Sequence, residues 1–190
     1  MRTSASVITL AFLLAFPQTA KATPFSIGFQ EVQPLEAFLN FYNGGFGSLG
    51  TGPGPNLGVT FTSQWVQVQP DVYGSPTGAS AGISSTSTMS LAVPFSGPFS
   101  FYYDGGALTV NFFDGANGSG NFIGQWNLPS AGVFIPTGAA LPAFQSAVFI
   151  SPGANRIDAL TFGALVIPEP GTFVLSLFSL GLLAALTRRN

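Results

Sequence analysis

The 190-residue chain contains no histidine and no cysteine, and only 6% of its residues are charged. Without these side chains, Ser-His-Asp and Cys-His catalytic arrangements and nearly all transition-metal sites are excluded. A pair of carboxylates, drawn from Asp104, Asp114 and Asp158, is the remaining option for catalysis and would suit glycoside hydrolysis. No cleft can be placed around them from the sequence, which therefore predicts a protein that is not an enzyme, with no catalytic residues.

Basic residues are also scarce, and four of the five lie in the terminal segments. Between residues 23 and 165 only Arg156 is basic, against six acidic residues. A surface of this kind cannot neutralise phosphates, so nucleic acid is excluded as a partner. The aromatic content of 14% nevertheless argues against a disordered chain, and 145 or so residues are about enough for one buried core.

The N-terminus has the pattern of a secretory signal peptide. Arg2 provides a basic head, Val7 to Phe16 is apolar, and Ala20-Lys21-Ala22 is a small-x-small exit. A buried helix could use the same apolar run, but Pro17 and the small residues favour processing. We expect signal peptidase to remove residues 1–22, which leaves Thr23 as the first residue of the exported protein.

The C-terminus has the pattern of a membrane segment. Residues 171–187 are apolar apart from small polar residues, a length at the lower limit for crossing a bilayer, and Arg188 and Arg189 follow at once. The positive-inside rule places this pair in the cytoplasm and the rest of the chain on the other side. A domain of this size could hardly bury a helix that is apolar on every face, so we expect a transmembrane helix.

Pro168-Glu169-Pro170 stands directly before this segment. The combination of that tripeptide, an apolar helix and a terminal Arg-Arg pair resembles the PEP-CTERM sorting tail, here residues 166–190. The resemblance implies an exosortase-type transpeptidase as a partner and, with the signal peptide, export to the cell envelope, cell surface or extracellular matrix of a Gram-negative bacterium. The two prolines keep the motif extended, as a processing enzyme requires.

Residues 23–165 show no useful helical periodicity, and apolar runs alternate there with Gly, Pro, Asn and Ser clusters. This sequence pattern predicts one all-β domain, a two-sheet antiparallel sandwich of the jelly-roll kind. Asp104-Gly105-Gly106 and the turn from Asp114 to Gly118 predict a meander of three adjacent strands. The expected strands are 25–29, 37–42, 58–68, 88–93, 99–103, 108–113, 121–128, 143–150 and 156–162.

The segment Asn43 to Gly58 is a long Gly/Pro-rich loop of the kind that is usually functional or mobile. Three segments of the domain are similar to a recurrent body type among PEP-CTERM proteins. They are Phe41-Tyr42-Asn43-Gly44-Gly45 at the start of the loop, Gly58-Val59-Thr60-Phe61 after it, and Ile157 to Gly163 near the end of the domain. That resemblance implies a sandwich and no particular activity.

The residue types in the domain allow two kinds of binding site. Asp104, Asp114, Asn117 and Asp158 could supply oxygen ligands to calcium, although Asp and Asn at such positions more often shape turns. Aromatic side chains could form a stacking platform for sugars, although core packing is their commoner role. The candidates for the platform are Tyr42, Trp65, Tyr73, Tyr102, Tyr103 and Trp126.

These observations favour a structural or adhesive envelope or matrix protein that is not an enzyme and has no cofactor. The alternative is a jelly-roll carbohydrate-binding module that recognises exopolysaccharide, with or without the help of calcium.

Overall fold

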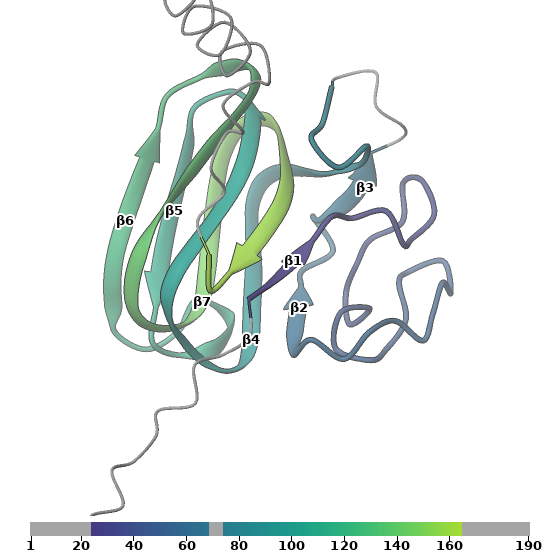
Figure 1. Ribbon diagram of the computed structural model, residues 1–190, viewed down its shortest axis with the longest axis horizontal. Coiled ribbons are helices and arrows are strands. Elements are labelled where there is room, and N and C mark those ends of the chain that lie inside the picture. Colours follow the sequence, from purple (N-terminus) through teal and green to yellow (C-terminus); the bar gives the residue numbers. More distant parts are fainter. Residues whose placement is uncertain (1–23, 69–73, 165–190) are drawn as a thin grey trace, which may run out of the picture.

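The computed structural model describes residues 24–68 and 74–164. In these ranges the regular secondary structure is almost entirely antiparallel strand, and residues 28–58 form turns and loops beside the strands (Figure 1). The strands are β1 (Phe25–Ile27), β2 (Val59–Phe61), β3 (Val66–Val68), β4 (Ser80–Gly105), β5 (Leu108–Phe113), β6 (Phe122–Leu128) and β7 (Ala131–Phe162), and the short 3-10 helix η1 (Ala116–Gly118) precedes β6. The predicted all-β class is confirmed.

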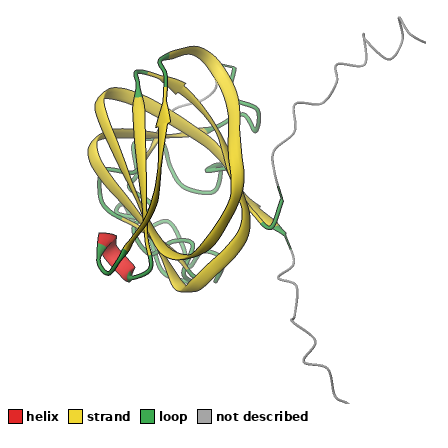
Figure 2. Ribbon diagram, turned by 90° about the vertical axis from the view of Figure 1, so that its left-hand side faces the viewer, coloured by secondary structure: helices red, strands yellow, loops and turns green. Residues whose placement is uncertain are grey.

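The strands form a two-layer antiparallel sandwich because the two longest, β4 and β7, bend and contribute to both layers (Figure 2). One layer has the order β2-β4-β7-β5-β6. In the other layer, Phe99 of β4 pairs with Ala139 on one side and with Phe162 on the other, so the second half of β4 lies between two parts of β7. Strand β1 extends that layer by pairing with the end of β7.

The core lies between these layers and is built from phenylalanine. Phe99 and Phe101 of β4 alternate with residues of the outer face, and their rings meet Phe112 of β5 at 6.0 Å and Phe149 of β7 at 5.7 Å between centroids. A second aromatic cluster surrounds the fully buried Trp65, whose ring lies 4.8 Å from that of Phe149. The two clusters therefore form one continuous core.

The predicted three-stranded meander is wrong. β5 pairs with β6 as expected, but its other neighbour is β7, and the 99–103 part of β4 lies across the core from β5. The turn at Asp104-Gly105-Gly106 carries the chain from one layer to the other. Gly105 has a φ of +115°, and a Cβ on it would come within 2.5 Å of the Ala154 carbonyl oxygen, so only glycine fits there.

Strand boundaries also differ from the prediction at several places. Ala37 forms an isolated bridge with Val66, and residues 39–42 form turns, in which Phe41 N–H donates to the Phe38 carbonyl and Leu39 has a positive φ. The side chains of Phe38, Phe41 and Tyr42 still enter the core, which explains the strand-like apolar pattern. The run 58–68 is divided into β2 and β3. The predicted strands 88–93 and 99–103 are parts of β4, and 143–150 and 156–162 are parts of β7.

The Gly/Pro loop is held in place by one buried carboxylate. Glu36 accepts hydrogen bonds from the backbone N–H groups of Gln33, Leu49 and Thr51 and from the Thr51 hydroxyl. Burial alone would raise the pKa of Glu36, but these donors, led by the Thr51 hydroxyl, favour the charged form, and the pKa lies below its usual value. Leu49 and Thr51 of the loop are thus tied to the segment that precedes Phe38 of the core.

Candidate functional site

The outer face of the larger layer carries a regular grid of side chains from four strands. Strand periodicity directs Leu108, Val110 and Phe112 of β5 inward, so Thr109, Asn111 and Phe113 point outward. The strand register aligns these three with residues of β4, β7 and β6 in three rows. The rows are Thr86-Ile150-Thr109-Asn127, Thr88-Val148-Asn111-Gln125 and Ser90-Ser146-Phe113-Phe122.

The β5–β6 half of this grid is a connected row of amides and hydroxyls. Thr109 Oγ1 lies 3.2 Å from Asn127 Oδ1, Asn127 Nδ2 donates to Gln125 Oε1 at 3.1 Å, and Gln125 Nε2 donates to Asn111 Oδ1 at 2.8 Å. All of these contacts are exposed to solvent. Each amide nitrogen has a second hydrogen and each oxygen a second lone pair, so the row keeps donors and acceptors for a ligand. We call Thr109, Asn111, Gln125 and Asn127 the amide row.

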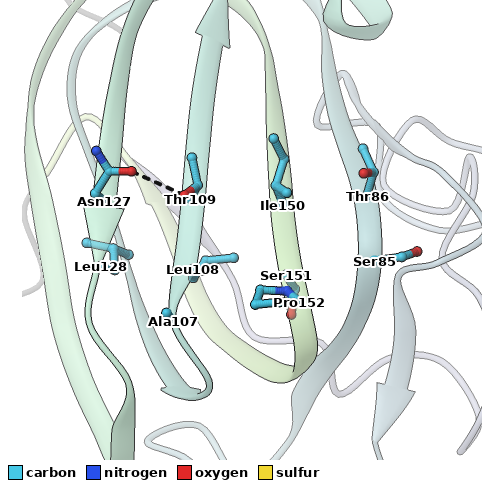
Figure 3. Close-up of a pocket in the computed structure, with 10 residues that line it drawn as sticks. All are labelled: Ser85, Thr86, Ala107, Leu108, Thr109, Asn127, Leu128, Ile150, Ser151 and Pro152. Carbon is cyan, nitrogen blue, oxygen red and sulfur yellow. Dashed lines mark hydrogen bonds between the residues drawn. The ribbon is translucent and has the colours of Figure 1, made fainter.

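A hollow of about 480 Å³ opens beside the first row of the grid (Figure 3). Thr86, Ile150, Thr109 and Asn127 lie along it, and Ser151 and Pro152 are at its end. Ile150 is 40% exposed and offers an apolar floor between two polar neighbours. No residue that lines the hollow is charged, so it suits a neutral ligand with both apolar and hydroxylated surfaces.

The other end of the grid is apolar. The rings of Phe113 and Phe122 meet at 6.0 Å in a T-shaped arrangement, and Phe122 is 58% exposed. Next to them, the turn at η1 covers Ser90 and Ser146, because Asn117 N–H donates to Ser90 Oγ and Gly118 N–H to Ser146 Oγ. The face therefore runs from a hollow, along the amide row, to an exposed aromatic pair.

Two of the four predicted calcium ligands, Asp114 and Asn117, shape the turn before β6. Asp114 accepts hydrogen bonds from the backbone and side-chain nitrogens of Asn121, and the Asn121 side chain lowers the pKa of Asp114. Asn117 has a φ of +57° and exchanges hydrogen bonds with Ser90. This matches the turn-forming alternative that the sequence left open.

The other two predicted ligands are buried in the smaller layer. Asp104 is paired with Arg156, whose guanidinium donates to both carboxylate oxygens. Asp158 accepts from the backbone and hydroxyl of Thr77 and from the Ala159 N–H; burial outweighs these donors and raises the pKa of Asp158. Within residues 24–68 and 74–164 no group of three or more acidic side chains is placed to hold a metal ion. Calcium binding at Asp104, Asp114, Asn117 and Asp158 stays a prediction.

The predicted aromatic platform is not formed by the residues expected. Tyr42, Trp65 and Tyr103 are buried in the core, and Tyr73 lies outside the described residues. Trp126 is half-buried and points inward, since it pairs with Val110 and its ring lies 4.8 Å from that of Phe112. Tyr102 is half-buried on the opposite face from Phe101, because successive side chains of a strand point to opposite faces.

The amide row was not among the sites predicted from the sequence, although the sequence contains a pattern that indicates it. Thr109 and Asn111 alternate with the inward residues of β5, and Gln125 and Asn127 alternate with Trp126 on β6. Two adjacent strands with polar outer residues at matching positions predict such a row once their register is known.

The sorting-tail residues Pro168, Glu169, Pro170, Arg188 and Arg189 and the expected span 171–187 lie outside the described residues. Residues 24–68 and 74–164 contain no helix that is long and apolar enough to cross a membrane. At the sequence level, the profile of the PEP-CTERM protein-sorting motif matches residues 166–190. The tail is a PEP-CTERM protein-sorting motif. The protein is therefore one that is exported and sorted to the cell envelope or surface, as the resemblance implied.

No curated protein matches this sequence. Among solved structures, a variant of a family 29 carbohydrate-binding module has 11% identity and a TM-score of 0.44 over 77% of this chain and 99% of its own. A family 6 module from Clostridium stercorarium, solved with cellobiose, has 14% identity and a TM-score of 0.36 over 55% of this chain and 90% of its own. A module of the Cellvibrio mixtus lichenase 5A, solved with cellotriose, has 16% identity and a TM-score of 0.38 over 53% and 87%. Values this low give no basis for transferring a binding site to this chain.

Proposed function

We propose that this is an exported envelope or matrix protein whose sorting tail is processed by an exosortase-type transpeptidase, and whose sandwich is a non-catalytic module that holds neutral polysaccharide. The domain organisation we propose is a signal peptide (1–22), the sandwich (23–165) and the tail (166–190) with a transmembrane helix at 171–187. The structural or adhesive role expected from the sequence and the carbohydrate-binding alternative are then one function.

The observation that carries this proposal is the uncharged outer face with its amide row. Sugars present hydroxyl groups that donate and accept hydrogen bonds, together with apolar ring faces, and the face offers amides, hydroxyls, Ile150 and the Phe113–Phe122 pair within one grid. Along β5 the distance from Thr109 to Phe113 is about 13 Å, which suits a chain of sugars better than a single one. Charged polysaccharides gain nothing here, because the face has no basic residue to pair with them.

A non-catalytic role is supported by the carboxylates. Asp104 and Asp158 are buried and hydrogen-bonded to their neighbours, and the surface hollows beside Ile150, Val93 and Ile83 have no aspartate or glutamate in their linings. Glycoside hydrolysis needs two carboxyl groups that face each other across an open groove.

Binding is tested with the chain recovered from its host envelope, titrated calorimetrically with the host's purified exopolysaccharide and with neutral cello-, xylo- and manno-oligosaccharides. We expect Gln125→Ala and Asn111→Ala each to weaken binding about fivefold to tenfold, the effect of about one lost hydrogen bond. Gln64→Ala changes an exposed glutamine in the turn between β2 and β3 and should leave binding unchanged. The absence of binding to every glycan, or equal losses in all three variants, would contradict the proposal.

Processing is tested by intact mass spectrometry of the protein from envelope and medium fractions of the host. A mass that begins at Thr23 and ends near Pro168 is the expected result. A mass that includes Arg188 and Arg189 in every fraction would mean that the tail is only an anchor.

A further inference from the structure

A second hollow, of about 200 Å³, lies at the edge of the sandwich and is lined by apolar residues and one glycine. Its walls include Phe25 of β1, Leu57, the β4 residues Val93, Pro94 and Phe95, and Phe162 at the end of β7. Val93 is 71% exposed, and no residue that lines the hollow is charged. An exposed apolar concavity of this kind usually marks a surface that meets another apolar body.

This hollow lies where the described chain begins and ends. Phe25 pairs with Phe162, and the two rings are stacked at 4.7 Å. Gly163 N–H donates to the Pro98 carbonyl and Ala164 O accepts from Ser100, so the chain leaves the domain beside this pair (Figure 2). The first residues of the mature domain and the last ones before the sorting tail therefore lie together at the hollow.

The length of the tail fixes how far this edge can be from the membrane. Eight residues, 163–170, connect Phe162 to Gly171, the first residue of the expected span. Fully extended, they reach about 27 Å, and the hydrogen bonds of Gly163 and Ala164 shorten that reach. While the tail is intact, the edge that carries the hollow is therefore held within about 27 Å of the first residue of the expected span.

We propose that, before the tail is processed, this apolar hollow rests on the outer surface of the lipid bilayer, with Val93 and Pro94 as its lipid contacts. The proposal rests on the sorting-tail function above. It commits to lipid because the tether keeps a bilayer within reach and because the hollow offers apolar surface without charge, as insertion at an interface requires. The contact would hold the Pro-Glu-Pro motif at the height of a membrane-embedded enzyme.

The absence of cysteine makes a direct test available. Val93→Cys, labelled with an environment-sensitive nitrobenzoxadiazole dye, is compared with Val133→Cys carrying the same label. Val133 is a matched control, because it is 67% exposed and lies near the opposite end of the smaller layer. It is close to the point where Tyr103 of β4 pairs with Ile135 of β7. The full chain is reconstituted into phosphatidylcholine vesicles, with and without lipids that carry a nitroxide on the head group, and vesicle flotation is measured in the same samples.

We expect chain that floats with the vesicles to show quenching at position 93 at least about twofold stronger than at position 133. Equal quenching at the two positions in floating chain overturns the lipid contact and leaves the tail function intact. A label at position 93 that is blue-shifted but not quenched also overturns it, since residues of the tail or a second copy of the chain would then cover the hollow. Chain that does not float overturns the anchoring function of the tail and this proposal with it.

Discussion

Arg156 of β7 lies directly opposite Asp104 of β4, and its guanidinium donates to both oxygens of that carboxylate. The Asp104 side chain is 3% exposed and that of Arg156 is 25% exposed. The domain thus uses its only basic residue to compensate a buried charge in the smaller layer, next to the turn that joins the two layers.

Removal of the cation should therefore destabilise the domain more than removal of both charges. We expect Arg156→Met to lower the free energy of unfolding by about 2 to 3 kcal/mol, since it leaves a buried carboxylate without its ion partner. The double variant Asp104→Asn/Arg156→Met should recover at least about half of that loss. Urea denaturation of the full chain in detergent measures both, and a double variant less stable than Arg156→Met would contradict the argument.

Of the two glycines in the turn between the layers, only Gly105 should be required for the stability of the domain. Gly105→Ala forces a side chain into a positive φ and against the Ala154 carbonyl, and we expect a loss of about 2 to 3 kcal/mol. Gly106→Ala is the control, because a Cβ there would meet nothing closer than 3.9 Å. Thermal unfolding of the two variants compares them, and equal losses would mean that the Gly105 conformation is not required.

The Glu36 carboxylate should make the domain sensitive to acid. Because its pKa is lower in the folded state, its contribution to stability is present above the unfolded pKa, near 4.5, and is lost as the pH falls through the folded pKa. Glu36→Gln should cost about 2 kcal/mol at neutral pH and flatten the loss of stability below pH 5. Glu31→Gln is the control, as exposed Glu31 only accepts from the Tyr42 hydroxyl, which an amide oxygen can replace. A Glu36→Gln variant with unchanged acid sensitivity would contradict this role.

Asp158 should respond to pH in the opposite direction. Its folded pKa is raised, so its contribution to stability is present below the unfolded pKa and is lost as the pH rises through the folded pKa. Thr77→Val removes a hydroxyl donor that favours the charged form and should raise the pKa of Asp158 further and cost about 1 kcal/mol. Carboxyl carbon NMR titration measures this shift. Thr77→Ser keeps the hydroxyl and should leave the pKa unchanged, and a raised pKa in this control would assign the effect to packing.

Calcium should have little effect on the sandwich. The carboxylates of Asp104, Asp114 and Asp158 already accept hydrogen bonds from Arg156, Asn121 and Thr77, respectively, and an ion would have to displace these donors. We expect the same melting temperature in calcium and in a chelator. A rise in calcium that Asp114→Asn abolishes would establish the site suggested by the sequence.

Local pattern was enough to predict part of the fold. The expected strand 108–113 has the same bounds as β5, because a half-buried strand has an apolar period of two wherever it lies. Apolar runs that alternate with Gly, Pro, Asn and Ser clusters predicted an all-β domain. The strand predicted at 37–42 was wrong for a related reason. Phe38, Phe41 and Tyr42 are buried from turns, and buried turn residues are as apolar in the sequence as those of a strand.

The sequence by itself determined the sorting motif at residues 166–190, the absence of histidine and thiol chemistry, and the all-β class, since motifs and compositions of this kind are read from neighbouring residues. The tertiary structure decided which strands pair, that Asp104-Gly105-Gly106 crosses between layers, and that β4 and β7 serve both. It also brought Asn111 and Gln125 into one row and Phe25 against Phe162. Pairings between residues far apart in the chain depend on the register and on how one core is filled, and neither is encoded in any single segment.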